Sequence, residues 1–347
     1  MDKRELLRKT GSFQQLASIR TLSFAEGRAQ TRAVELVNGP LRFTALADKC
    51  LDIAELSWRG VNFSFLSKPG LQGRNQYDTH GDEALRSIMG GFFFTAGLEN
   101  ICAPCTIAGK DYPMHGRIRT TPAEHLCADA RWEGEDYVLE LRGEMREAEL
   151  FGENLVLRRS LRTVYGQKSF TLTDEIENQS FRDEPLMLLY HINIGYPLLD
   201  EGTRLYLPTR GVTPREELSA PHAERWNVMD APKDNEPEYV FIHDPIPDGE
   251  GRMSACVVNE RLELGLRIGW DTKNLPFFME WKSTASGDYV LGLEPANSSV
   301  YGRPWHEKRG ELHHLAPLAA ERNELVFTVL DGREEIDAAI AAIRSVR

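Results

Sequence analysis

Three side chains able to transfer protons stand at positions where the sequence pattern does not predict a solvent-exposed residue. His191 interrupts the apolar run LLYHINIGYP, and Glu294 ends the alternating run YVLGLEP. His115 lies in YPMHGRIRTTPAEH and precedes Gly116, a residue that lets the backbone approach a ligand closely. Imidazole and carboxyl groups are common general acids and bases. Two histidines and a glutamate therefore suit a reaction in which one oxygen gains a proton and another loses one.

Each of these residues also has a structural interpretation. A histidine inside a strand can be a hydrogen-bonded core residue, and a glutamate at a strand end can be a surface or loop-capping acid. Lys282 and Glu280, in the preceding run FFMEWK, could form an ion pair, and the tight connection STASGD could bring Lys282 close to Glu294. The sequence has no H-E-x-x-H, no G-x-S-x-G, no P-loop and no dinucleotide glycine pattern, which removes the common hydrolase, kinase and dehydrogenase interpretations.

Most of the chain alternates apolar and polar residues, as half-buried strands do, because successive strand residues face opposite sides of a sheet. Turn residues such as VNGP, EGED and YGQKS separate these runs. The pattern predicts strands at 32–37, 41–46, 136–145, 155–166, 169–178, 261–270, 277–283, 289–295 and 324–330. Many antiparallel strands at short spacing favour an all-β fold, a large sandwich or barrel.

A clear helical pattern appears at the C-terminus. Apolar residues recur at helical spacing over 336–346, with Asp331 and Glu334 expected as the cap and the third helical residue. A short helix is expected in DKRELLRK near the start. The Pro-rich segment 214–237 is expected to be a long loop. No composition shift marks a boundary, so the sequence predicts one domain over residues 1–347.

The composition restricts the partners and the location of the protein. The 347 residues carry a net charge of −12 with a pI of about 5.3 and no dense run of lysine and arginine, so neither nucleic acid nor a membrane surface is expected as a partner. No signal peptide and no membrane span of about 20 apolar residues is recognisable. A soluble, cytoplasmic protein is expected, and a homodimer stays open.

Five cysteines stand at irregular spacing, which does not predict a disulfide framework. Cys102 and Cys105 form the sequence CAPC, but a structural zinc site needs a second pair, and Cys127 and Cys256 do not supply it. We therefore expect reduced thiols, and neither a metal nor an organic cofactor.

Six stretches of the chain resemble the aldose 1-epimerase (galactose mutarotase-like) superfamily. The match is closest to the branch described as aldose 1-epimerase family proteins. The stretches are LDIAELSWRG, LRSIMGGFFFTAGLEN, MHGRIRTTPAE, LLYHINIGYPLL, FFMEWKS and LGLEPANSSVYGR. They occur in the family order over roughly residues 30–330. The resemblance implies an antiparallel β supersandwich, to which the helical pattern adds a C-terminal helix. It places His115, His191 and Glu294 at the family's two histidines and late glutamate.

The resemblance implies a cofactor-free opening and closing of an aldose ring. Glu294 would take the proton of the anomeric hydroxyl, His191 would protonate the ring oxygen, and His115 would steady the developing charge. Asn193 shares a strand face with His191 and could contact the same ligand. The remaining implied substrate-binding residues are Arg86 in place of a family arginine, Asp244 or Asp271 in place of a family aspartate, and Arg117, Lys282 and Arg303.

Other functions stay open on the sequence. A non-catalytic sugar-binding β-sandwich would keep the fold without an ordered acid–base pair. An epimerase acting on a sugar phosphate or sugar acid is favoured if Arg86, Arg117, Lys282 and Arg303 converge. In each case the partner is a small-molecule carbohydrate.

Overall fold

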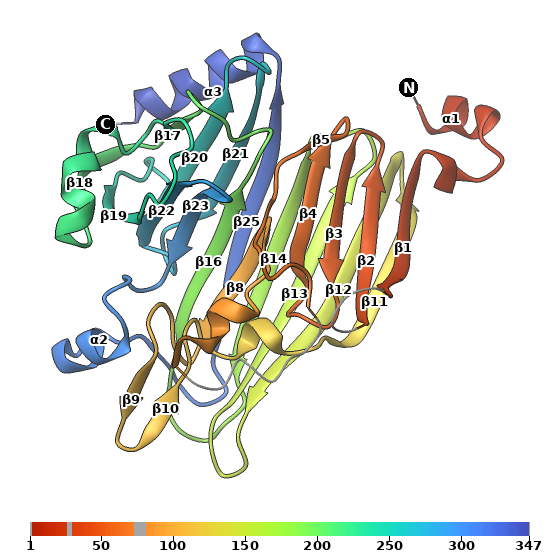
Figure 1. Ribbon diagram of the computed structural model, residues 1–347. Coiled ribbons are helices and arrows are strands. Elements are labelled where there is room, and N and C mark those ends of the chain that lie inside the picture. The colour runs from red at the N-terminus through yellow and green to blue at the C-terminus, as the bar shows by residue number, and fades with distance from the viewer. Residues whose placement is uncertain (1, 26–29, 73–80, 347) are drawn as a thin grey trace.

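The chain folds into three main antiparallel sheets that pack around an apolar core (Figure 1). The computed structural model describes residues 2–25, 30–72 and 81–346. Within these residues every pairing between named strands is antiparallel. The expected all-β antiparallel class is confirmed.

The three sheets differ in size, and their strands are given in spatial order. The eight-stranded sheet contains β11 (Glu124–Glu133), β12 (Asp136–Ala148), β13 (Asn154–Val164), β14 (Ser169–Asn178), β25 (Ala320–Asp331), β21 (Leu264–Asp271), β20 (Arg252–Asn259) and β17 (Arg204–Tyr206). The six-stranded sheet contains β18 (Thr209–Pro214), β19 (Glu238–Pro245), β22 (Phe277–Ala285), β23 (Asp288–Ala296), β16 (Met187–Ile194) and β8 (Phe93–Leu98). The five-stranded sheet contains β1 (Ala17–Phe24), β2 (Thr31–Asn38), β3 (Leu41–Leu46), β4 (Asp52–Trp58) and β5 (Val61–Asn62).

Short strand pairs and helices complete the fold. The two-stranded pairs are β6 (Phe65–Leu66) with β7 (Gly90–Gly91), β9 (Cys105–Ile107) with β10 (Lys110–Tyr112), and β15 (Glu184–Pro185) with β24 (His314–Leu315). The α-helices are α1 (Lys3–Lys9), α2 (Arg303–Arg309) and α3 (Arg333–Ser345). The 3₁₀ helices are η1 (Phe13–Gln15), η2 (Gly81–Arg86), η3 (Ile118–Thr120) and η4 (Glu217–Arg225). No helix in the described ranges is long and apolar enough to cross a membrane.

The structure refines three expectations. The segment expected as a loop over 214–237 contains η4, and β21 begins at Leu264 because a turn occupies the preceding residues. Asp331 is not the cap of α3, since Gly332 holds that position without a side-chain hydrogen bond. Instead, the backbone N–H of Asp331 donates to the carboxylate of Glu335 at 3.0 Å.

Both smaller sheets lie against the inner face of the eight-stranded sheet (Figure 1). In the five-stranded half, Phe43 stacks on Phe170 at 4.6 Å between ring centroids. In the six-stranded half, Phe278 stacks on Trp270 at 5.3 Å. Burial of these rings removes apolar surface from water, the main favourable contribution to folding. The outer face of the six-stranded sheet does not pack against the eight-stranded sheet, so it is available for a binding site.

A buried ionic network links the sheets beneath that outer face. Arg159, on β13, is fully buried and lies 2.8 Å from Asp52 and 2.7 Å from Asp174. It also donates to the hydroxyl of Thr95, while the hydroxyl of Tyr190 donates to Asp174. Thr95 lies on β8 and Tyr190 on β16, so the network fixes the inner face of these two strands. Their sequence neighbours Phe94 and His191 face outward, because successive strand residues point to opposite sides of a sheet.

Candidate active site

The three side chains that could transfer protons line one cavity on the outer face of the six-stranded sheet. The cavity has a volume of about 980 Å³. Its lining includes His115, His191 and Glu294, which come from three distant parts of the chain. A second groove, of about 1070 Å³, lies elsewhere, between α3 and the eight-stranded sheet, and no described histidine lines it. Of these two cavities, the first is the one that brings imidazole and carboxyl groups together.

His191 and Glu294 are in direct contact on neighbouring strands. Nε2 of His191 lies 3.0 Å from Oε1 of Glu294, and the two side chains are 7% and 5% exposed. The strands β16 and β23 pair antiparallel at this point, which brings the two side chains to the same face. Phe94, on β8, stacks on the His191 ring at 4.4 Å. Strand pairing on both sides of β16 thus holds the imidazole in a fixed orientation.

The environment of this pair disfavours separated charges. Burial raises the pKa of Glu294 to about 8, with the Arg215 guanidinium opposing the rise. Burial lowers the pKa of His191 to about 3, and a contact with Asn193 opposes this shift. At pH values between these two pKa values, the pair holds one proton, which lies on the hydrogen bond that joins the two groups. The pair can therefore supply one proton that moves between a carboxylate and an imidazole.

His115 contributes a neutral hydrogen-bond donor. The backbone N–H of Cys102 donates to Nδ1 of His115 at 3.3 Å, so the ring proton is assigned to Nε2. Burial lowers the pKa of His115, with further lowering by His191, so the ring is uncharged near neutrality. The His115 and His191 rings lie 5.8 Å apart. His115 can thus donate to an oxygen without being the acid.

Gly116 has a different role from the one expected. A Cβ at this position would lie 2.0 Å from the carbonyl oxygen of Gly97 and 2.8 Å from that of Asn100. The glycine therefore permits backbone-to-backbone packing and does not make room for a ligand. This packing places the preceding residue, His115, at the cavity wall.

Gly292 makes room within the site itself. A Cβ there would lie 3.1 Å from Cε1 of His191 and 3.1 Å from the side chain of Trp281. Trp281 pairs with Gly292 across β22 and β23, lines the cavity and donates from Nε1 to Glu238 at 2.7 Å. An indole fixed in this way is a platform for the apolar face of a sugar ring.

Among the residues implied to bind substrate, Arg86 and Asn193 line the cavity. Asn193 donates to the carbonyl oxygen of Gly90 at 3.1 Å, and its Oδ1 is buried without a partner among the described residues. That oxygen is available to accept a hydrogen bond from a ligand or from Nδ1 of His191, which likewise has no partner in the described part of the chain.

The expected approach of Lys282 to Glu294 is wrong. Met279 is the residue that pairs with Glu294, so Glu280 and Lys282 face the opposite side of the sheet. Nζ of Lys282 donates to the carbonyl oxygens of Arg225 at 2.8 Å and Val228 at 2.6 Å. Lys282 therefore holds the end of η4 on the sheet and cannot reach a substrate in the cavity.

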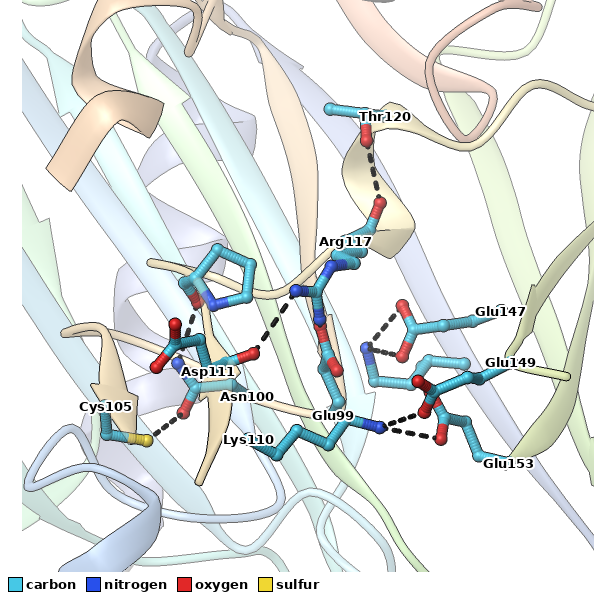
Figure 2. A network of polar contacts seen from close by, with 12 residues as sticks. Glu99, Asn100, Cys105, Lys110, Asp111, Arg117, Thr120, Glu147, Glu149 and Glu153 are labelled. Atoms are coloured by element: carbon cyan, nitrogen blue, oxygen red, sulfur yellow. Dashed lines mark hydrogen bonds and ion pairs between the residues drawn. The ribbon is translucent and has the colours of Figure 1, made fainter. Parts of the chain in front are cut away.

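Arg117 and Arg303 also lie outside the cavity. Figure 2 shows Arg117 in a polar network in which it forms an ion pair with Glu99 and donates to the carbonyl oxygen of Asp111 at 3.2 Å. Arg303 donates to the carbonyl oxygen of Glu99 at 2.5 Å and packs over the ring of Tyr112 at 4.2 Å. Both arginines brace the segment that leads to His115. Because three of the four expected cations lie elsewhere, the convergence that would favour a sugar phosphate does not occur.

The two candidate aspartates lie away from the cavity as well. Asp244 is exposed and forms an ion pair with Arg210 at 3.1 Å. Asp271 lines the groove beside α3. The carboxylates that do line the cavity are Glu236, Glu238 and Asp288 besides Glu294. Of these, Asp288 forms an ion pair with Lys68 at 2.5 Å, and Lys68 also lines the cavity.

The cysteines of the CAPC sequence are free thiols in different surroundings. Cys102 lines the cavity, and its pKa is raised mainly by burial. Cys105 forms a hydrogen bond with Asn100 in the network of Figure 2. Across residues 2–25, 30–72 and 81–346, no three His, Cys, Asp or Glu side chains are grouped as a metal site.

Comparisons with other proteins concern both family and fold. The family model described as a domain of unknown function (DUF4432) matches residues 28–329. None of the curated proteins matches the chain. A candidate aldose 1-epimerase from Klebsiella pneumoniae matches with a TM-score of 0.88 at 23% identity, covering 100% of this chain and 91% of that one.

Two further solved structures match most of the chain at lower identity. A galactose mutarotase-like protein from Clostridium acetobutylicum has a TM-score of 0.63 at 13% identity, covering 91% of this chain and 99% of that one. Galactose 1-epimerase from Lactobacillus acidophilus has a TM-score of 0.55 at 11% identity, covering 91% and 100%. The galactose mutarotase-like fold expected from the sequence is confirmed, and at these identities the likeness concerns the fold alone.

Proposed function

Since the chain belongs to the family described as a domain of unknown function (DUF4432), whose description assigns no activity, we propose a function from the site. The protein interconverts the α and β anomers of an aldose or aldose derivative by general acid–base catalysis. The observation that carries the proposal is the 3.0 Å contact between His191 and Glu294. It lies in a cavity of sugar-binding size with aromatic walls.

The reaction uses the single proton of the pair. In the form with the proton on the imidazole, Glu294 takes the proton of the anomeric hydroxyl while His191 gives its proton to the ring oxygen. The bond between the anomeric carbon and the ring oxygen breaks, its electron pair goes to that oxygen, and an aldehyde forms. Rotation about the adjacent carbon–carbon bond and closure with the roles reversed give the other anomer. His115 donates from Nε2 toward the oxygens and stabilises the developing charge.

The separation of the acid and the base suits this chemistry. The anomeric and ring oxygens are bonded to the same carbon, so one group must accept a proton within a few ångströms of where the other gives one. A pair already in contact meets this demand, and a substrate whose two oxygens contact the pair completes a short path for both protons. A protein that only binds sugars has no need for such an arrangement.

The test is direct observation of mutarotation. Freshly dissolved single anomers of a panel of neutral aldoses, sugar acids and sugar phosphates are followed by polarimetry or exchange NMR, with and without protein. We expect acceleration of at least one aldose. Binding of a sugar by calorimetry without acceleration of any member of the panel would instead support a non-catalytic sugar-binding protein.

The rate should depend on pH through the pair. As pH rises through about 8, the pKa of Glu294, the pair loses its proton, so the base remains but the acid is lost and the rate falls. As pH falls toward about 3, the pKa of His191, the pair gains a second proton and the base is lost. Exchange NMR at pH 4–10, corrected for uncatalysed mutarotation, should give a plateau with a falling upper limb. A rate that keeps rising above the upper pKa would contradict the scheme.

Gly292→Ala should lower the rate by about 10-fold or more, because the added methyl group displaces His191 or Trp281 and small misplacements of catalytic groups are costly. Gly269→Ala on β21 is the matched control, since the nearest atom to its Cβ is the carbonyl oxygen of Met253 at 3.7 Å. Rates by exchange NMR and melting temperatures should separate the two variants. Equal rates in both would show that Gly292 does not position the site.

A further inference from the structure

Arg215 lies in the cavity at a position that the sequence pattern did not select. It follows β18, and its backbone N–H donates to the carbonyl oxygen of Val240 at 2.9 Å, which fixes the main chain against β19. Its side chain lines the same cavity as His191 and Glu294. The end of η4, further along this segment, is held on the sheet by Lys282. The guanidinium is therefore presented from an anchored segment.

The guanidinium of Arg215 has unused donors. Nε and one terminal nitrogen lie 2.9 Å and 2.6 Å from a single carboxylate oxygen of Glu216, whose side chain is 55% exposed. The other terminal nitrogen donates to the sulfur of Cys102 at 3.6 Å, and a thiol sulfur is a weak acceptor. Of the five N–H groups of an arginine, two have no partner among the described residues.

The charge of Arg215 acts on the acid–base pair. It is the chief interaction that opposes the burial-induced rise in the pKa of Glu294. It also contributes to the lowered pKa of His115, after burial, His191 and Arg119. A cation that influences both groups favours a carboxylate on Glu294 and an uncharged ring at His115, the two forms that the reaction uses.

We propose that Arg215 completes the acid–base site: its guanidinium binds a substrate hydroxyl beside the anomeric centre and stabilises the carboxylate form of Glu294. This role rests on the proposed function. Burial favours the protonated carboxyl group of Glu294, and the Arg215 guanidinium opposes that effect, so it increases the share of the carboxylate form that acts as the base. Planar donors in a fixed fork also suit recognition of an oxygen on a sugar ring.

Three variants test the proposal. Arg215→Gln removes the charge, Arg215→Lys keeps the charge but loses the fork, and Arg225→Gln is the matched control. Arg225 lies on the same segment, forms an ion pair with Asp230 and does not line the cavity. Exchange NMR with the aldose that the wild type turns over gives kcat and KM. The ¹³C resonance of the Glu294 carboxyl group, assigned with Glu294→Gln, gives its titration independently of activity.

Arg215→Gln should lower kcat/KM by about 10–100-fold, as expected for loss of a charged hydrogen-bonding partner, and should shift the titration of Glu294 to higher pH. Arg215→Lys should raise KM while keeping most of kcat and the titration, and it carries the test if the glutamine variant fails to fold. Arg225→Gln should match the wild type. An active wild type whose kinetics and titration both survive Arg215→Gln overturns the role of Arg215 alone. A wild type that accelerates no aldose overturns the proposed function and this role together.

Discussion

Glu294→Gln is expected to lower the rate of anomer interconversion by about 10²–10⁴-fold, the usual contribution of a general base, while the protein stays folded. Glutamine keeps the shape of the side chain and can still hydrogen-bond a hydroxyl, but it cannot accept the proton. It also ends the exchange of a proton with His191, whose Nε2 lies 3.0 Å from Oε1 of Glu294. Exchange NMR on single anomers measures the rate, and uncatalysed mutarotation sets the lower limit.

The opposite face of the same sheet offers a matched control. Glu280 is also a fully buried glutamate beside a histidine, with Oε2 3.3 Å from Nε2 of His243, and neither residue lines the cavity. Glu280→Gln should therefore retain most of the rate even if it lowers the melting temperature. His191→Asn should lose rate as Glu294→Gln does, because it removes the acid. Equal losses in Glu280→Gln and Glu294→Gln would indicate that the rate follows stability and not the base.

The strands with strong alternation were predictable because one face of each is buried. The run over 169–178 coincides with β14, in which every even-numbered residue is buried and no odd-numbered residue is. In contrast, β20, whose residues from 255 to 259 are all buried, gives no period-two signal. The same holds for β16, where an apolar run indicates a buried element and the histidine supplies the additional clue.

His191 and Glu294 stand out in the sequence, but the expectation that Lys282 approaches Glu294 across the hairpin is wrong. The turn at Ser286 and Gly287 pairs Ala285 with Asp288, and this register places Met279 opposite Glu294. A one-residue difference in register moves every side chain to the other face. Counting outward from a two-residue turn would have selected Trp281 and rejected Lys282.

The remaining cavity residues depend on contacts that are distant in sequence. Arg215 stands in a polar segment without periodicity, and its place in the cavity follows from the pairing of β18 with β19 and from the fixing of η4 by Lys282. Conversely, Arg117 stands beside His115 in sequence, yet it turns away to pair with Glu99 (Figure 2). Neighbourhood in sequence does not determine on which side of a loop a long side chain lies.

Arg159→Met is expected to lower the free energy of unfolding by about 3–5 kcal/mol, because it leaves the buried carboxylates of Asp52 and Asp174 without their cation. The deficit should shrink as the pH is lowered. Burial already raises the pKa of Asp52 to about 6 against the opposing charge of Arg159, and without that charge the pKa rises further. A group with a raised pKa in the folded state contributes stability at low pH that is lost as pH rises through that pKa.

Denaturant unfolding of Arg159→Met and Arg158→Met at pH 5 and pH 8 tests this prediction. Arg158 precedes it on β13, points to the outer face at 39% exposure and pairs with Glu144, Glu175 and Glu177, so its loss should cost about 1 kcal/mol or less. Thr95 and Tyr190 join the network from the strands that carry Phe94 and His191. Arg159→Met should therefore also loosen the acid–base pair and lower the rate in the folded fraction. Equal stability of the two variants would show that the buried carboxylates are neutralised in some other way.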